Sequence, residues 1–279
     1  MMMHDEQNES MQNTCAVCAF NNPRGTVSAV IIRDGKLLLL KRATEPFKGM
    51  WDFPGGYMDA RETQLETVRR EVSEELGVES RADFIGWFPG TGPWQGKEYP
   101  ILNHAYLIEI KDEIRLDTQE NVECAWVPLQ DANDIAFDSN KKIIAHVKEK
   151  FMVDFATVQN LVGQLDASAQ VSEMNFYRAM LNGYVSKKMV DGKLVGLGWI
   201  FPRQTLLRRQ AVVEDMIVDE SMRGKGFGKE ILLDLLRWAK ENDMEMVELT
   251  SGSHRIPANE LYKKVGFQLH PTNHYLYKV

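Results

Sequence analysis

A run of glutamates on one predicted helix constrains this chain more than any other feature. Between positions 56 and 78 the sequence reads GYMDARETQLETVRREVSEELGV. At about 100° per residue, a helix places Glu71, Glu74 and Glu75 within an arc of roughly 100°. An apolar stripe at helical spacing lies beside that arc, formed by Leu65, Val68, Val72 and Leu76. Because Gly77 is typical of a helix end, the segment predicts a helix over residues 62–76 with one acidic side and one buried side.

Three carboxylates this close together repel one another and need a cation. Their hard oxygen ligands suit Mg²⁺ or Mn²⁺, which can bridge the two phosphates of a pyrophosphate and lower the pKa of an attacking water. Arg70 stands one turn before Glu74 and can hold a glutamate through a charge-assisted bond. The alternative is a solvated acidic helix face. It explains neither Arg70 nor the two glycines at 55 and 56, which let the preceding loop turn tightly and approach the metal.

The same segment fits the pattern G-x5-E-x7-R-E-U-x-E-E-x-G-U, in which U is aliphatic, at every fixed position. It resembles the Nudix box, and the resemblance to Nudix hydrolases covers about residues 24–150. That resemblance implies an α/β/α sandwich and the hydrolysis of a nucleoside diphosphate linked to another group. It also implies that Glu71, Glu74 and Glu75 are metal ligands, with Glu74 or Glu75 as the catalytic one. Glu62 lies where it could orient these ligands.

The loops beyond this helix decide the substrate. Nudix ADP-ribose hydrolases often carry a proline shortly past the box, where this chain has Pro93, so we expect ADP-ribose or a relative. Four aromatic residues could stack on a base or simply pack in the core and loops: Trp51, Trp87, Trp94 and Tyr99. Many Nudix enzymes use a further glutamate from a later loop, and three candidates stay open here: Glu98, Glu120 and Glu123.

A glycine-rich loop marks the second half of the chain. Residues 214–229 read EDMIVDESMRGKGFGK, with a predicted strand before the loop and a helix after it. That helix has a clean apolar face of Ile231, Leu232, Leu235 and Trp238. Backbone amides of residues 224–229 would point at a pyrophosphate at the helix N-terminus. A dinucleotide-binding unit is the competing interpretation, but it needs G-x-G-x-x-G early in a βαβ unit and an acid about 20 residues later.

The sequence after that helix favours another family. Residues 258–267 read ANELYKKVGF and resemble a conserved element of the GNAT acetyltransferase superfamily, in that family's order of strand, glycine loop, helix and strand. The resemblance covers about residues 155–279 and implies acetyl-CoA as co-substrate. The implied pantetheine contacts are the backbone groups of Met216, Ile217 and Val218. The implied pyrophosphate contacts are Arg223, Gly224, Lys225, Gly226, Phe227, Gly228 and Lys229.

The same resemblance implies roles in catalysis. Tyr262 would protonate the departing thiolate as general acid, and Asn259 would touch the cofactor. Glu214 or Asp215 could take the proton of the amine, directly or through water. The alternatives are a core tyrosine on a helix and a solvent-facing strand glutamate. Ser251, His254 and Arg255 could shape the acceptor site, although nothing in the sequence identifies the acceptor amine.

The N-terminal residues 1–13 are polar and lack periodicity, which is typical of a flexible segment. Cys15 and Cys18 follow and resemble half of the zinc ribbon that precedes some Nudix domains. A structural zinc needs four ligands, and Cys124 and His4 are remote, so we expect a degenerate remnant without zinc. A zinc site shared between the two chains of a homodimer is the alternative.

Composition and charge exclude several classes of protein. The net charge of −7 disfavours nucleic acid and anionic membranes as partners. No apolar run approaches the roughly 18 residues of a membrane span, and the first residues lack the features of a secretory signal. Three cysteines make no disulfide framework. We therefore expect a soluble, cytoplasmic protein with reduced thiols.

The whole sequence predicts an α/β (α+β) protein of two domains. A flexible segment of residues 1–23 precedes a Nudix domain of residues 24–153 and a GNAT domain of residues 154–279, with a mixed-sheet acyltransferase fold. The hypothesis is a bifunctional enzyme that hydrolyses a nucleoside diphosphate derivative and acetylates an unknown amine. One alternative makes the GNAT domain a sensor that binds acetyl-CoA without turnover. A second makes the Nudix domain a nucleotide sensor, against which the complete box argues.

Overall fold

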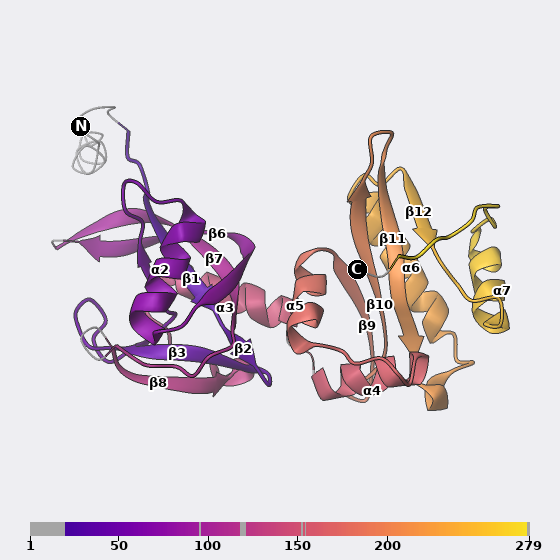
Figure 1. Cartoon of the computed structure of the whole chain (residues 1–279), viewed down its shortest axis with the longest axis horizontal. Helices are drawn as coiled ribbons and strands as arrows, with labels where there is room; N and C mark the ends of the chain where they lie inside the picture. Colours follow the sequence, from indigo (N-terminus) through magenta and orange to yellow (C-terminus); the bar gives the residue numbers. More distant parts are fainter. Residues whose placement is uncertain (1–19, 95, 118–120, 152, 154, 278–279) are drawn as a thin grey trace, which may run out of the picture. The chain divides into compact units, whose positions relative to one another are not determined.

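The computed structural model describes residues 20–94, 96–117, 121–151, 153 and 155–277 of the chain. The chain divides into two compact units, Met1–Phe155 and Ala156–Val279 (Figure 1). Each unit combines helices with β-sheet, so the predicted α/β fold class is confirmed. Cys15 and Cys18 lie outside the described residues.

The N-terminal unit contains two sheets. The first has the order β5-β1-β7-β6, in which β1 and β7 run parallel and the other neighbours antiparallel. Its strands are β1 (Arg24–Val30), β5 (Gly55–Tyr57), β6 (Ser80–Trp94) and β7 (Lys97–Ile110). In the second sheet, β3 pairs with β2, β4 and β8. Those strands are β2 (Ile32–Arg33), β3 (Lys36–Arg42), β4 (Trp51–Asp52) and β8 (Asn121–Pro128).

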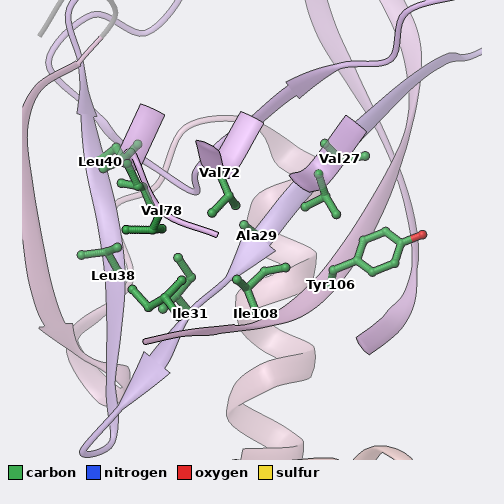
Figure 2. Close-up of a cluster of buried hydrophobic side chains, with 12 residues drawn as sticks. Val27, Ala29, Ile31, Leu38, Leu40, Val72, Val78, Tyr106 and Ile108 are labelled. Carbon is green, nitrogen blue, oxygen red and sulfur yellow. The ribbon is translucent and has the colours of Figure 1, made fainter. Parts of the chain in front are cut away.

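Two helices cover opposite faces of the first sheet. Helix α2 (Gln64–Leu76) buries its apolar stripe in a core that it shares with Val27 and Ala29 of β1 (Figure 2). Successive strand residues face opposite sides, and Ser28 accordingly reaches Asn140 of helix α3 (Asp138–Phe151) on the other face. The helix–sheet–helix arrangement is the predicted sandwich. Each fully buried aliphatic side chain in it contributes roughly 1.5–3 kcal/mol.

The core around α2 draws on both sheets, and this fixes where the helix lies. Figure 2 shows Leu38 and Leu40 of β3 beside Val72 of α2, with Ile108 of β7 completing the cluster. These side chains are almost fully buried. Because the apolar stripe of α2 is held on several strands at once, the carboxylates beside that stripe are held at the edge of the core.

The C-terminal unit has one sheet of order β12-β11-β10-β9. Its strands are β9 (Tyr184–Val190), β10 (Lys193–Gln204), β11 (Arg209–Val218) and β12 (Met246–Leu249). Its helices are α4 (Phe155–Leu165), α5 (Glu173–Leu181), α6 (Phe227–Glu241) and α7 (Ile256–Val265), with a 3-10 turn over Glu220–Met222. The apolar face of α6 packs on the sheet through Ile231 and Leu235.

Two local predictions about this unit were wrong. Helix α5 forms where no helix was predicted, and its N-cap Ser172 accepts a hydrogen bond from the Asn175 backbone. Residues 273–279 read NHYLYKV, a composition that predicts a final strand, but the described residues 273–277 form none. There Tyr275, Leu276 and Tyr277 are at least 84% exposed. A β-rich sequence without a neighbouring strand gains no pairing, which is why propensity alone misled here.

Candidate active sites

Local sequence fixes both ends of α2. Thr63 caps the start: its hydroxyl accepts a hydrogen bond from the Glu66 backbone, and the Glu66 carboxylate accepts one from the Thr63 backbone at 2.8 Å. This reciprocal pair satisfies two otherwise unpaired N–H groups. Gly77 ends the helix at φ +65°, a conformation that glycine adopts without steric cost. The register of the glutamates on α2 is therefore set within the motif itself.

The loop before α2 lies directly against its carboxylates. The Gly55 backbone donates a hydrogen bond of 2.8 Å to Glu75 Oε2. A Cβ atom at Gly56 would lie 2.5 Å from Glu71 Oε1, and one at Gly55 would lie 2.2 Å from the Val27 carbonyl oxygen. Any side chain would fill this cradle. The double glycine thus permits the close approach that the sequence predicted.

Arg70 gathers three of the glutamates around its guanidinium. Its Nη1 donates to Glu71 Oε1 and Glu74 Oε2, both at 2.9 Å, and its Nε donates to Glu62 Oε1 at 2.7 Å. The hydrogen bond from Arg70 lowers the pKa of Glu62 to about 2. Glu62 therefore stays ionised and anchors Arg70, whereas Glu74 keeps 57% of its side chain exposed.

Glu75 is the most perturbed carboxyl group of this cluster. It is buried, and burial raises its pKa to about 8, with repulsion from Glu71 and Asp52 adding to the effect. Hydrogen bonds from Gly55 and from Asn121 Nδ2, the latter at 2.9 Å, oppose that shift. Burial and the neighbouring carboxylates thus both disfavour the ionised form of Glu75 in the absence of a cation.

The donor set fits a hard divalent cation. Within the described part of the chain, no three acidic, histidine or cysteine side chains stand ready to hold an ion together. Glu71 and Glu74 instead share the guanidinium of Arg70. Carboxylate oxygens are nonetheless the ligands that Mg²⁺ prefers. Glycine at position 56 brings the backbone of the loop against the Glu71 carboxylate, and the exposed Glu74 side chain can rotate from Arg70 toward an ion.

A buried polar network supports the loop from behind, and sequence reasoning missed it. The carboxylate of Asp52 accepts hydrogen bonds from Arg42 at 2.8 Å and from Asn140 at 2.6 Å. Asn140 in turn accepts from Ser28 and from Asn103 of β7. Burial raises the pKa of Asp52 to about 6 despite Arg42. Ser28 and Asn103, which are polar residues in the otherwise apolar strands β1 and β7, were the sequence signal that could have indicated this network.

The other candidates of this unit are scattered. Glu98 is exposed at the start of β7, and Glu123 pairs with Lys41 at 3.3 Å on β8. Glu120 and the Trp94 side chain lie outside what the structure describes. Trp87 is 64% exposed, and its ring lies tilted against that of Phe84 rather than filling the core, with 5.1 Å between the ring centroids.

In the C-terminal unit a cavity opens where two parallel strands diverge. Strands β11 and β12 pair only from Gln210 and Met246 to Val213 and Leu249. Beyond Val213, strand β11 continues to Val218 without β12 beside it. A cavity of about 540 Å³ lies at this divergence. The backbone of residues 214–218 therefore has a free edge toward the cavity.

The cavity brings the predicted catalytic residues together. Glu214, Met216 and Tyr262 all line it, although they come from β11 and α7. The predicted loop residues Ser251, His254 and Arg255 line it too. Burial raises the pKa of Tyr262, with Arg255 opposing the shift. Burial also raises the pKa of Glu214, and repulsion from Asp215 adds to it.

The glycine loop adopts the conformation that its sequence requires. Gly224 and Gly226 have φ values of +77° and +88°, and Gly226 is the N-cap of α6. A Cβ atom at either position would meet nothing within 4 Å, so backbone conformation rather than crowding demands glycine there. Arg223 Nε donates to the Val218 carbonyl at 3.0 Å and ties the loop to β11.

The remaining predicted cofactor contacts lie around this loop. Ile217 is buried, and the Lys188 ammonium lies 4.8 Å from the ring centroid of Phe227. Lys225 and Lys229 follow in the loop and the first turn of α6. Asn259 Nδ2 donates to the Gly252 carbonyl at 3.0 Å, so in this structure it ties α7 to the loop after β12.

Comparison with known proteins divides the chain at the same place as its architecture. Residues 22–147 match the model of the NUDIX domain, and residues 156–267 match that of the acetyltransferase (GNAT) family. An ADP-ribose pyrophosphatase of Methanocaldococcus jannaschii is 27% identical over 130 residues, which are 46% of this chain and 76% of that protein. The low-salt glycan biosynthesis protein Agl8 of Haloferax volcanii is 31% identical over 134 residues, which are 43% and 85%.

Among solved structures, an acetyltransferase of Trypanosoma brucei aligns with a TM-score of 0.38 and 24% identity. The alignment covers 45% of this chain and 93% of that one. A search of the described residues finds no helix that is long and apolar enough to cross a membrane.

Proposed function

Because the chain belongs to the Nudix family through residues 22–147 and to the GNAT acetyltransferase family through residues 156–267, we propose that it is a bifunctional enzyme. Its Nudix domain, residues 24–153, hydrolyses the pyrophosphate of a nucleoside diphosphate derivative with Mg²⁺ or Mn²⁺. Its GNAT domain, residues 154–279, transfers acetyl from acetyl-CoA to an amine. The observation that carries the first activity is the packing of Gly55 and Gly56 against Glu71 and Glu75.

Each residue of the Nudix cluster has a distinct proposed task. Glu71, Glu74 and Glu75 hold the divalent cation, which when bound supplies Lewis-acid activation of the pyrophosphate and its attacking water. Arg70 keeps its bonds to Glu62 and releases Glu74 toward the cation. Glu74 or Glu75 accepts the proton of the water. Exposure favours Glu74, because Gly55 and Asn121 already occupy the oxygens of Glu75.

For the substrate we propose ADP-ribose or a close relative. The position of Pro93 beyond the motif and the similarity to an ADP-ribose pyrophosphatase support this choice. The direct test is release of AMP from ADP-ribose by the purified full chain with Mg²⁺, beside a panel of other nucleoside diphosphate derivatives. Activity on another diphosphate without AMP release from ADP-ribose would replace the substrate but keep the reaction.

The observation that supports the second activity, acetyl transfer, is the cavity that Tyr262 lines together with Glu214 and Met216. Pantetheine runs along the free backbone edge of Met216, Ile217 and Val218, and amides of residues 223–229 bind the pyrophosphate of acetyl-CoA. Glu214 takes a proton from the amine, whose nitrogen then attacks the acetyl carbon. The C–S bond breaks, Tyr262 gives its proton to the thiolate, and the acylated nitrogen returns a proton to Tyr262 as the amide forms.

A sensor that binds acetyl-CoA without turnover is the competing function. The meeting of Glu214 and Tyr262 in one cavity favours the enzyme, because a sensor requires neither an acid nor a base there. Calorimetry of the full chain with acetyl-CoA tests binding, and an assay of free thiol with an amine panel tests turnover. Binding without turnover on any amine would support the sensor.

A further inference from the structure

The charges around the cavity of the C-terminal unit are unequal. Three carboxylates line it, those of Asp166, Glu214 and Asp215, against the single guanidinium of Arg255. His254, His274 and Tyr262 complete the titratable lining. Around neutral pH the cavity therefore carries an excess of negative charge. Ser251 Oγ also lines it, buried and without a hydrogen-bond partner in the structure, so the cavity offers further polar capacity.

Arg255 and Asp166 offset each other at one end of the cavity. Hydrogen bonds from Ser168 lower the pKa of Asp166, and Arg255 adds a smaller effect of the same sign, so Asp166 stays ionised. Arg255 Nη2 donates to the Leu165 carbonyl at 3.5 Å, at the end of α4. One guanidinium therefore offsets only one of the three carboxylates that line the cavity.

Glu214 and Asp215 form the unmatched pair. Consecutive strand residues normally face opposite sides of a sheet, but a bulge interrupts β11 here. Trp199 of β10 pairs with Glu214 and Leu197 pairs with Ile217, while Asp215 takes φ +50°. The bulge turns both acidic residues toward the cavity. Among the described residues neither carboxylate makes a hydrogen bond or an ion pair. Repulsion from Asp215 adds to the raised pKa of Glu214, and His274 opposes that shift.

From this imbalance we infer that the acetyl acceptor is an aliphatic amine that carries a second positive charge, as a diamine does. The inference rests on the proposed acetyltransferase function. One ammonium gives its proton to Glu214 and becomes the nucleophile, while the second ammonium stays charged and binds Asp215. The new C–N bond forms as the C–S bond breaks, and Tyr262 protonates the thiolate and regains a proton from the acylated nitrogen. The product is a neutral amide that keeps the one positive charge of the second ammonium. An acceptor with its own carboxylate would face three like charges against the single guanidinium of Arg255.

The test uses three amines of equal chain length with the full chain and acetyl-CoA. These are 1,4-diaminobutane, butylamine and 4-aminobutyrate, which differ only in the charge of the far end. We expect kcat/KM to fall by roughly tenfold from the diamine to butylamine, and further to 4-aminobutyrate, as for a partly desolvated ion pair. The preference for the diamine should shrink as salt is raised.

A variant then assigns that preference to one side chain. Asp215→Asn should bring the kcat/KM ratio of diamine to butylamine close to one, because it removes the charge and keeps the shape. Asp243→Asn, at another left-handed position outside the cavity lining, is the matched control and should keep the ratio. An unchanged ratio in Asp215→Asn, or a preference for 4-aminobutyrate, would overturn the inference.

Two results separate this inference from the function on which it rests. If acetyl-CoA binds in calorimetry but no amine of the panel is acetylated, the dicationic acceptor is rejected while the cofactor site stands. If acetyl-CoA does not bind the full chain, the acetyltransferase proposal fails and the acceptor inference falls with it.

Discussion

The two acidic clusters of this molecule differ in where their positive charge comes from. In the N-terminal unit, the guanidinium of Arg70 forms ion pairs with Glu62, Glu71 and Glu74. In the C-terminal unit, Glu214 and Asp215 make no ion pair among the described residues, and Arg255 is the single guanidinium that lines their cavity. The first cluster is held in place before any ligand arrives. The second leaves its charge for a ligand to neutralise.

The difference reflects how each cluster is built. Helix α2 carries Glu71, Glu74 and Glu75. The same short motif also contains Arg70, whose guanidinium orients Glu71 and Glu74. The cavity of the second unit takes residues from α4, β11, α7 and the loop after β12. The distances between charged side chains on one helix are set by their spacing in the sequence. The distances between charged side chains of separate segments are set only when the chain folds.

The strongest test of this contrast removes one carboxylate of α2. Glu75→Gln should lower kcat for pyrophosphate hydrolysis by about 10²–10⁴-fold, because a metal ligand or base is lost at the reacting centre. Glu79→Gln, at an exposed glutamate just after α2, is the matched control. Steady-state kinetics with Mg²⁺ and circular dichroism check activity and fold together. A Glu74→Gln/Glu75→Gln double variant with normal turnover would contradict the assignment.

The next largest effect concerns the glycine loop of the other unit. Gly226→Val should abolish measurable acetyl-CoA binding, because valine strongly disfavours φ +88°. The barrier is conformational, since space around the Cβ position is open. Gly163→Ala on α4, where space is also open and no positive φ arises, should bind normally. Nudix hydrolysis should survive in both variants, and its loss in Gly226→Val would argue against separable units.

Tyr262→Phe sharpens the contrast between binding and chemistry. The variant removes only the hydroxyl, so acetyl-CoA affinity in calorimetry should change less than about threefold while kcat for acetyl transfer falls about 10–100-fold. The raised pKa of Tyr262 keeps its proton available throughout the neutral range. Phe267, which packs against this ring, provides the control as Phe267→Leu. Equal kcat in Tyr262→Phe and the wild type would remove Tyr262 from catalysis.

The smallest expected effect is on the stability of the fold, through the pH-dependent ionisation of Glu62. Its pKa is lowered from 4.5 to about 2 by Arg70, so its ionised form favours the folded state. That contribution is present in full above the ordinary pKa and is lost as pH falls from about 5 toward 2. Melting temperatures of the wild type and Glu62→Gln should therefore differ modestly at pH 6–7 and converge in acid. A difference that persists at pH 2 would assign the effect to something other than this charge.

Much of the N-terminal site could be predicted because its parts are neighbours in sequence. The helix, its acidic face, the double glycine and the role of Arg70 follow from spacing within residues 55–77. The Asp-Gly turns at 34–35 and 191–192 likewise adopt the positive φ values typical of tight hairpins. The network of Asp52 with Asn140 could not be predicted, because the two residues are 88 positions apart in the sequence. A polar residue in a strand does not indicate which distant residue it will bind.

The sequence by itself determined which chemical groups this protein carries and how they are ordered along each helix and loop, since backbone propensity and side-chain periodicity act over a few residues. Only the tertiary structure decided which groups are buried and which face one another. Burial raises the pKa of Glu75 to about 8, and the bulge at Asp215 turns two consecutive acids into one cavity. Both effects depend on desolvation and on strands from elsewhere in the chain, which no local pattern encodes.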